Sequence, residues 1–383
     1  MKKATLFFLL FLCALTTIEA QTIYETIQSP RFENERQLKI QLPRGYTNNP
    51  DKNYPLFVVF DGDYLFEVVA GNVDYCSYWE DMPEAIVVGI NQIDSRFDDC
   101  MYSEQNSLPI ETGAAFFEFI GMELIPHIEK KYRVGAFRAA VGHGETANFI
   151  NYYLLKPQPL FQSYIAISPK LAPDMLDYLP ERFANIESKT FYYLANTNND
   201  SGSIKKMTKT LNTDASNIDN KNLYYKFKTF EGPSYYSLPA HVIPNALEAI
   251  FQVFQPISKK EYKEVILELE ISPTEYLQEK YQIIADVFGI EKQILVNDFK
   301  AISAAIEKNE TFEYYEELGK MARKQYPETL LGSYYLARFY EETGEPKKAM
   351  RTYQSAYTLR ELAGITKEEV LDRANAIKED FGY

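Results

Sequence analysis

The fold is decided by the stretch Arg138-Ala139-Ala140-Val141-Gly142-His143-Gly144-Glu145-Thr146-Ala147-Asn148-Phe149. Its first residues are mostly small or apolar, as in a strand that is covered on both faces of a sheet. Gly142, His143 and Gly144 follow, and glycines of this kind allow the backbone a tight turn. The apolar residues over 146–155 then have helical spacing. The stretch therefore predicts a strand, a tight turn and a helix.

Similar apolar runs recur on both sides of this stretch. They lie at 56–60, 85–90, 137–141, 164–167 and 191–195, and a further run at 38–42 alternates between apolar and polar residues. Helical spacing appears between them at 114–131, 146–155 and 239–254. Strands that alternate with helices favour a mostly parallel sheet with helices on both faces. We therefore expect the α/β class, with a doubly wound sheet, over residues 21–258.

The remainder of the chain has a different pattern. Over 259–383 the strand signals stop, and Glu, Lys, Ala, Leu and Tyr dominate, which predicts a smaller all-helical domain. Tetratricopeptide-like spacing is seen in Leu336, Ala337, Tyr340, Gly344, Ala349, Tyr353 and Ala356, with a partial copy 34 residues earlier. The alternatives are about two such repeats or an irregular helical extension. Thr366 to Glu369 predicts the start of the last helix.

Composition narrows the range of partners. The chain has 383 residues, with 40 Lys and Arg against 54 Asp and Glu, and a net charge of −14. An acidic protein is repelled by nucleic acid, so no nucleic-acid partner is expected. The chain has only three His and three Cys and contains no HExxH or CxxC pattern. We therefore predict no metal site and no cofactor.

The first twenty residues resemble a secretory signal peptide. Lys2 and Lys3 precede an apolar run at 6–15, and Ala20 ends a small-residue cleavage site. No later stretch is long and apolar enough to span a membrane. We expect a secreted or periplasmic protein that begins at Gln21. Cys76 and Cys100 would then remain, either as a disulfide or as two buried thiols.

The turn at 142–144 lies in the context of a hydrolase nucleophile elbow, G-x-S-x-G. Other segments strengthen the likeness: LPRGY at 42–46, YPLFVVFDG at 54–62, VVGIN at 87–91, ELIPHIEKKYR at 123–133 and YIAISP at 164–169. Over about 24–258 the chain resembles the putative-esterase family of α/β hydrolases. That family includes S-formylglutathione hydrolases, siderophore esterases and feruloyl esterases. The resemblance implies an α/β-hydrolase fold and an esterase site; the helical domain lies outside the family's common core.

The chain departs from the family pattern at the catalytic positions. The family elbow is G-H-S-x-G-G; Gly142 and His143 match it, but Gly144 stands at the nucleophile position. Glycine has no hydroxyl, so no acyl-enzyme can form there. By the resemblance, the base position falls on Tyr235, which is protonated near pH 7 and a poor base. The acid position falls in the loop that holds Asp200. The sequence therefore predicts a degenerate triad.

Two further sets of residues surround this turn. Glu145 could activate water, although an acidic residue in a first helical turn also simply favours the helix dipole. The predicted ligand-binding residues are Asp61, Gly62, Tyr64, Tyr235 and Tyr236. Tyrosines at a cleft can stack on sugars or enclose a small ligand.

Three functions remain open at this stage. The first is a catalytically inactive pseudo-esterase that acts as a binding or scaffold module, with a protein partner on its helical repeats. The second is an active carboxylic-ester hydrolase that uses non-standard residues. The third is a carbohydrate- or siderophore-binding protein of the cell envelope, with a small ester or glycan as ligand.

Overall fold

The computed structural model describes residues 22–382. The predicted signal peptide at 1–20 lies outside them. Contacts divide the chain into two compact units, Met1–Ile250 and Phe251–Tyr383. This division precedes the predicted boundary at Ser258 because Phe254 and Ile257 interact with the helical unit. The Lys292 ammonium lies 3.6 Å from the centre of the Phe254 ring, and the Ile257 amide donates to Asp298.

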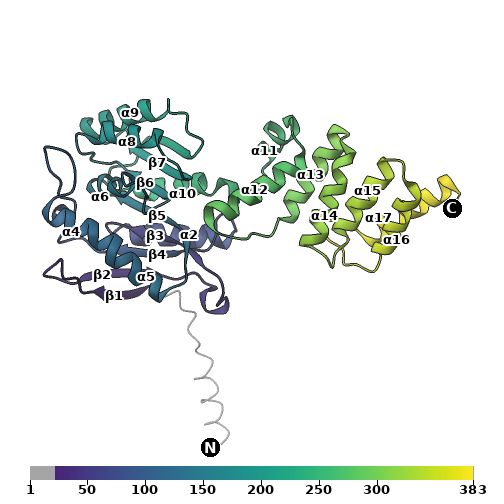
Figure 1. Cartoon of the computed structure of the whole chain (residues 1–383), viewed down its shortest axis with the longest axis horizontal. Coiled ribbons are helices and arrows are strands. Elements are labelled where there is room, and N and C mark those ends of the chain that lie inside the picture. The colour runs from purple at the N-terminus through teal and green to yellow at the C-terminus, as the bar shows by residue number, and fades with distance from the viewer. Residues whose placement is uncertain (1–21, 383) are drawn as a thin grey trace, which may run out of the picture. The chain divides into compact units, whose positions relative to one another are not determined.

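The first unit contains one eight-stranded sheet (Figure 1). Its order is β1-β2-β4-β3-β5-β6-β7-β8. The strands are β1 (Ile23–Ile27), β2 (Arg36–Gln41), β3 (Tyr54–Val59), β4 (Ile86–Ile90), β5 (Val134–His143), β6 (Ser163–Ile167), β7 (Thr190–Thr197) and β8 (Leu223–Phe230). β1 pairs antiparallel with β2, and β2 with β4, whereas β3 to β8 run parallel. The predicted α/β class with a mostly parallel sheet is confirmed.

Burial explains the strand patterns. Every residue of β3, β4, β6 and β7 is buried, which matches their continuous apolar runs. The edge strand β8 instead alternates between half-buried and exposed residues over most of its length. Sequence analysis did not predict β1 or β8, because edge strands lack a continuous apolar run.

Helices cover both faces of the sheet. They are α2 (Phe66–Tyr78), α3 (Arg96–Asp99), α4 (Glu111–Phe119), α5 (Ile125–Lys131), α6 (Glu145–Phe149), α7 (Asn151–Leu154), α8 (Met175–Ala184), α9 (Gly202–Ala215) and α10 (Leu238–Ile250). The main core joins α4, α5, α8 and α9 to one face through alternate strand residues such as Val58 and Tyr164. α2 and α10 pack together and contact β4 and β7.

The second unit is all-helical. Its helices are α11 (Lys259–Glu264), α12 (Pro273–Phe288), α13 (Val296–Asn309), α14 (Tyr315–Gln325), α15 (Leu330–Glu342), α16 (Pro346–Ala356) and α17 (Lys367–Phe381). α13 and α15 begin 34 residues apart, the period seen in the sequence. As predicted, the last helix begins after Thr366, whose side chain accepts a hydrogen bond from the Glu369 amide.

Close contact between α14 and α15 depends on two glycines, and this yields a first prediction. A Cβ atom on Gly332 would lie 2.5 Å from the Arg323 backbone nitrogen and 2.8 Å from the Gly319 carbonyl oxygen. Gly332→Val should therefore force the two helices apart and destabilise the second unit by about 1–3 kcal/mol. Urea unfolding followed by far-UV circular dichroism measures the effect. Gly71→Val is the control, since Gly71 is exposed on α2 and a Cβ atom there would meet nothing within 4 Å; equal losses in the two variants would contradict the packing argument.

Candidate active site

The predicted strand, turn and helix are present at the centre of the sheet. β5 ends at His143, and α6 begins at Glu145. Gly144 between them has φ 64° and ψ −113°, a backbone conformation that glycine adopts without strain and other residues do not. A Cβ atom on Gly142 would lie 2.6 Å from the Thr146 backbone, so that position also requires glycine. The turn therefore has the sharp strand-to-helix geometry of a nucleophile elbow.

The tip of the elbow is occupied by a tyrosine hydroxyl. A Cβ atom built on Gly144 would lie 2.1 Å from the Tyr235 hydroxyl oxygen and 3.3 Å from Nη2 of Arg96. A contact of 2.1 Å between a carbon and an oxygen is far below van der Waals distance. No side chain at position 144 can therefore coexist with Tyr235 in its present position. The two departures from the esterase pattern, Gly144 and Tyr235, are therefore sterically linked: the tyrosine hydroxyl fits only because residue 144 has no side chain.

Tyr235 is held as a neutral phenol. Its ring packs on the His143 ring with 4.1 Å between centroids. Burial, together with the negative charge of Glu145, raises the pKa of Tyr235 to about 12. The hydroxyl therefore remains protonated at neutral pH, and it serves neither as a general base nor as an anionic nucleophile.

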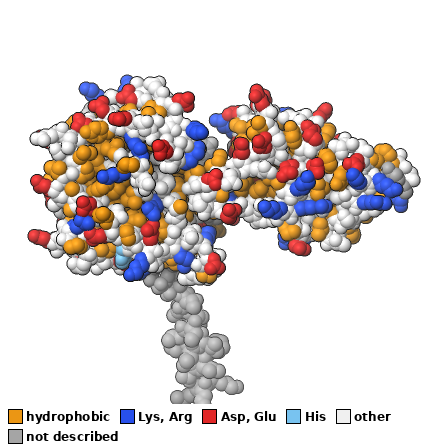
Figure 2. All heavy atoms as spheres, in the orientation of Figure 1, with side chains coloured by type: hydrophobic (Ala, Val, Ile, Leu, Met, Phe, Trp, Pro, Cys, Tyr) orange, Lys and Arg blue, Asp and Glu red, His pale blue; other side chains and the backbone are white. Residues whose placement is uncertain are grey.

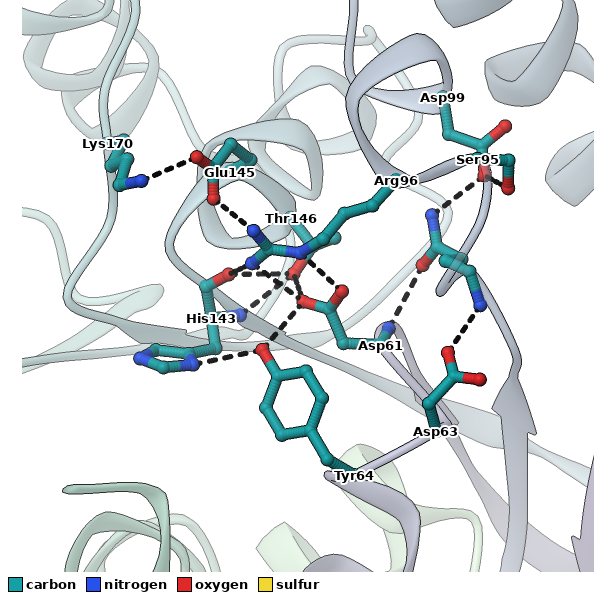
Figure 3. Close-up of polar contacts among 11 residues, drawn as sticks. Asp61, Asp63, Tyr64, Ser95, Arg96, Asp99, His143, Glu145, Thr146 and Lys170 are labelled. Atoms are coloured by element: carbon teal, nitrogen blue, oxygen red, sulfur yellow. Dashed lines mark hydrogen bonds and ion pairs between the residues drawn. The ribbon is translucent and has the colours of Figure 1, made fainter. Parts of the chain in front are cut away.

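Asp61 lies close to Thr146 and Arg96, beside the first turn of α6 (Figure 3). It follows β3, is buried, and has a positive φ of 55°. Its carboxylate accepts hydrogen bonds from Arg96 Nε at 2.6 Å, from the Thr146 hydroxyl at 2.6 Å and from the Tyr64 hydroxyl at 3.1 Å. The Asp61 amide donates to the Gln92 side chain at 3.0 Å. These bonds tie the loop after β3 to the first turn of α6.

Arg96 joins two carboxylates at the elbow (Figure 3). Its guanidinium pairs with Asp61 and with Glu145, and Nη2 donates to the His143 carbonyl at 2.7 Å. Glu145 also pairs with Lys170 at 2.5 Å. Burial acts against the charge on Arg96, but the Asp61 carboxylate outweighs it and raises the pKa of Arg96. The result is an alternating chain of two acidic and two basic groups.

The same pairing makes Glu145 a weak base. Burial alone would raise the pKa of Glu145, but the hydrogen bond from Lys170 and the charge of Arg96 together lower it below its usual range. A carboxylate with a lowered pKa holds a proton poorly. The arrangement therefore favours an ion-pairing role for Glu145 over activation of water.

His143 is buried beneath the turn. It is 1% exposed, and its Nδ1 lies 3.0 Å from the Tyr64 hydroxyl. Burial and the nearby positive charge of Arg96 lower the pKa of His143 to about 3, so the imidazole is neutral at physiological pH. The other two histidines lie elsewhere: His127 is beside Glu25, and His241 is exposed on α10.

The depressed pKa of His143 predicts a loss of stability in acid. An unfolded histidine takes up a proton near pH 6.5, whereas folded His143 does so near pH 3. Between these values the unfolded chain binds more protons, so stability falls as pH drops, by up to about 1.4 kcal/mol per pH unit. His143→Gln should show a shallower fall between about pH 6.5 and 4.5 in urea unfolding. His127→Gln is the matched control, and parallel curves for the parent and His143→Gln would contradict the assignment.

Asp200, the predicted triad acid, lies in the turn after β7. It is 5% exposed and accepts hydrogen bonds from the Ser168 hydroxyl at 2.6 Å and the Thr197 amide at 2.9 Å, both at Oδ2. Within the described residues its Oδ1 has no hydrogen-bond partner. The Asn199 side chain and the Thr197 hydroxyl both donate to the Pro233 carbonyl. The acid loop is therefore joined to the loop that carries Tyr235.

The predicted ligand-binding residues differ in their accessibility. Asp61 and Gly62 are buried, and a Cβ atom on Gly62 would lie 2.7 Å from the Ile90 backbone nitrogen. Tyr64 and Tyr236 are 45% and 87% exposed. Only these two tyrosines present large apolar surface to solvent, and a ligand role for the set stays a prediction. Sequence reasoning assigned no role to Arg96 or Lys170, because their ion-pair partners lie far from them in the chain.

Between 22 and 382, no three His, Cys, Asp or Glu side chains are placed to hold a metal ion. Cys76 and Cys100 are free thiols, which answers the question left open by the sequence. Among the helices of the described residues, none has the length and hydropathy needed to cross a membrane.

Comparisons with known proteins agree with this geometry. An uncharacterised protein from Capnocytophaga ochracea is 29% identical, with a TM-score of 0.83 over 94% of this chain and 100% of that one. An IroE-like serine hydrolase from Shewanella oneidensis is 19% identical, with a TM-score of 0.58 over 79% of this chain and 98% of that one. The BES protein from Bacillus cereus is 21% identical, with a TM-score of 0.53 over 61% of this chain and 97% of that one. No curated protein matches.

A protein-family model matches this chain directly. The family model described as "Putative esterase" matches residues 29–224, which is half of the chain and includes the elbow and Asp200. The mostly parallel sheet and the sharp strand-to-helix turn at Gly144 have the arrangement of the α/β-hydrolase fold. The chain therefore belongs to the Putative esterase family, with an additional helical unit at its C-terminal end.

Proposed function

We propose that this protein is a pseudo-esterase: an esterase-family domain that binds rather than hydrolyses. The observation that carries the proposal is the Tyr235 hydroxyl, 2.1 Å from where a Cβ atom on residue 144 would lie. A serine esterase needs a hydroxyl at this point and a base beside it. Here the nucleophile is absent, and the side chain at the base position fills its place.

Electrostatics at the elbow supports the same proposal. An acyl-transfer site stabilises a developing negative charge with donors that are free to bond it. The Arg96 guanidinium is instead engaged by Asp61, Glu145 and the His143 carbonyl. The Glu145 carboxylate also places a fixed negative charge at the first residue of α6, next to the elbow. Both features oppose oxyanion formation.

The alternative of an active hydrolase with non-standard residues is less well supported. Glu145 is paired twice, and its pKa is lowered, so it is poorly suited to take a proton from water. Asp200 is bonded to Ser168 and the Thr197 amide. No nucleophile stands at the elbow in either case, and fold alone does not establish an activity.

The proposal extends to location and partners. With the predicted signal peptide at 1–20, the protein would be secreted or periplasmic. A domain that keeps its fold without a nucleophile can still bind other molecules on its surface. The helical unit, with its 34-residue helix spacing, offers one such surface for a protein partner.

The test is a direct assay for ester hydrolysis. The purified two-unit protein is incubated with activated acyl esters of graded chain length and, separately, with a fluorophosphonate label. We expect no hydrolysis above the buffer rate and no labelling. Labelling, or turnover lost on Glu145→Gln, would overturn the proposal and establish an unconventional hydrolase.

A small ligand at the mouth of the site is a second candidate, favoured by the exposed rings of Tyr64 and Tyr236. A ligand that binds only the folded state raises the melting temperature. Thermal shifts with oligosaccharides and catecholate siderophores test this candidate. A shift that disappears in Tyr236→Ala would support it, and unchanged melting temperatures across the panel would contradict it.

A further inference from the structure

The end of the helical unit carries an apolar surface cavity. The cavity has a volume of about 280 Å³ and is lined by Tyr353, Gln354, Tyr357 and Leu371. Tyr357 is 50% exposed and Leu371 is 41% exposed. The surface at Tyr357 and Leu371 is therefore apolar and open to solvent.

The two helices that border this cavity have opposite charges. α16 contains Lys347, Lys348 and Arg351 and no acidic residue. α17 contains five acidic residues, Glu368, Glu369, Asp372, Glu379 and Asp380, and three basic ones. Basic side chains gather over this end of the helical unit in Figure 2. One surface therefore holds a basic helix, an apolar cavity and an acidic helix side by side.

We infer that this surface is an interface between two copies of the chain. A two-fold axis through the cavity would place α16 of each copy against α17 of the other. Such an arrangement pairs the basic helix with the acidic helix twice, and it covers both cavities with the exposed parts of Tyr357 and Leu371. A two-fold interface requires a surface that is complementary to itself, and this surface meets that requirement in charge.

Self-complementarity favours a second copy over another partner. A short peptide that filled the cavity would satisfy the apolar side chains, but it would need opposite charges at its two edges. A second copy of the chain supplies both the apolar side chains and the two opposite charges. The proposal is independent of the esterase site, because it uses only residues of the second unit.

The first test compares the oligomeric state of three proteins. Sedimentation velocity over a range of concentrations should show a monomer–dimer equilibrium for the parent. Leu371→Glu should weaken dimerisation at least about 30-fold, because it buries two unpaired charges in the interface. Ile271→Glu is the matched control, since Ile271 is 42% exposed in the same unit but does not line the cavity. The control should dimerise like the parent.

A charge exchange tests the pairing itself. Arg351→Glu and Asp372→Arg should each weaken the dimer by about threefold to fivefold, because exposed ion pairs contribute less than about 1 kcal/mol. The double variant should recover most of the parent's affinity. Rescue of this kind depends on the two helices facing each other, and a general loss of folding would not produce it. Circular dichroism confirms that each variant is folded.

Three results would overturn the inference. The first is a parent that is monomeric at every concentration. The second is a dimer that Leu371→Glu leaves unchanged, since the interface would then lie elsewhere. The third is a double charge variant that is weaker than either single variant.

Discussion

Gly144→Ser combined with Tyr235→His is expected to create ester hydrolysis at this elbow. The serine would stand at an elbow that already has the required backbone geometry. The histidine would remove the hydroxyl that now lies 2.1 Å from the Cβ position. It would also face the loop of Asp200, whose Oδ1 has no partner among the described residues. A positioned base contributes about 10²–10⁴-fold, so we expect at least a 100-fold rise in kcat/KM for an activated acetyl ester.

The single variants are the controls for this result. Gly144→Ser alone should be inactive and destabilised, because the new side chain collides with Tyr235. Tyr235→His alone should be stable but inactive, because no nucleophile is present. The double variant should therefore be more stable than the sum of the two single destabilisations predicts. A double-mutant cycle measures this difference in the free energy of unfolding.

Asp200 can be tested in the active background. Adding Asp200→Asn to the double variant should remove most of the gained activity if Asp200 orients the new histidine. The double variant could show no turnover even though a crystal structure places the serine and the histidine together. Arg96 or Glu145 would then still block the site. Arg96 lies 3.3 Å from the Cβ position, so its guanidinium must shift slightly to admit the serine.

The second large effect concerns the stability of the first unit. Arg96→Met should destabilise it by about 3–5 kcal/mol, because Asp61 is 2% exposed and would lose its only positive partner in the described residues. Urea unfolding followed by far-UV circular dichroism measures this loss. Lys170→Met should cost less than about 1 kcal/mol, because Lys170 is half-exposed where it meets Glu145.

A compensating change separates charge from packing. Arg96→Met with Asp61→Asn leaves no buried carboxylate at that point, so part of the lost stability should return. If the double variant is as unstable as Arg96→Met, the loss comes from the missing side-chain contacts rather than from the unpaired charge.

Local patterns in the chain were sufficient for most of the fold. The continuous apolar runs of β3 and β4 predicted buried strands, because burial on both faces removes the alternation that a half-exposed strand shows. The esterase resemblance predicted altered triad positions at Gly144 and Tyr235, and the structure brings these two residues together. The edge strands β1 and β8 were missed, because both lack the continuous apolar run that marked the buried strands.

By itself, therefore, the sequence determined the α/β class, the helical second region and the strand-turn-helix with a glycine at its tip, because each depends on residues close together in the chain. Only the tertiary structure decided what fills the vacant position. Tyr235 lies 91 residues from Gly144, yet its hydroxyl stands where the nucleophile's side chain would begin. Arg96, 49 residues from Glu145, links that residue to Asp61. Contacts over such separations come from the order of strands in the sheet, which brings the loops after β3, β4, β5 and β8 to one edge.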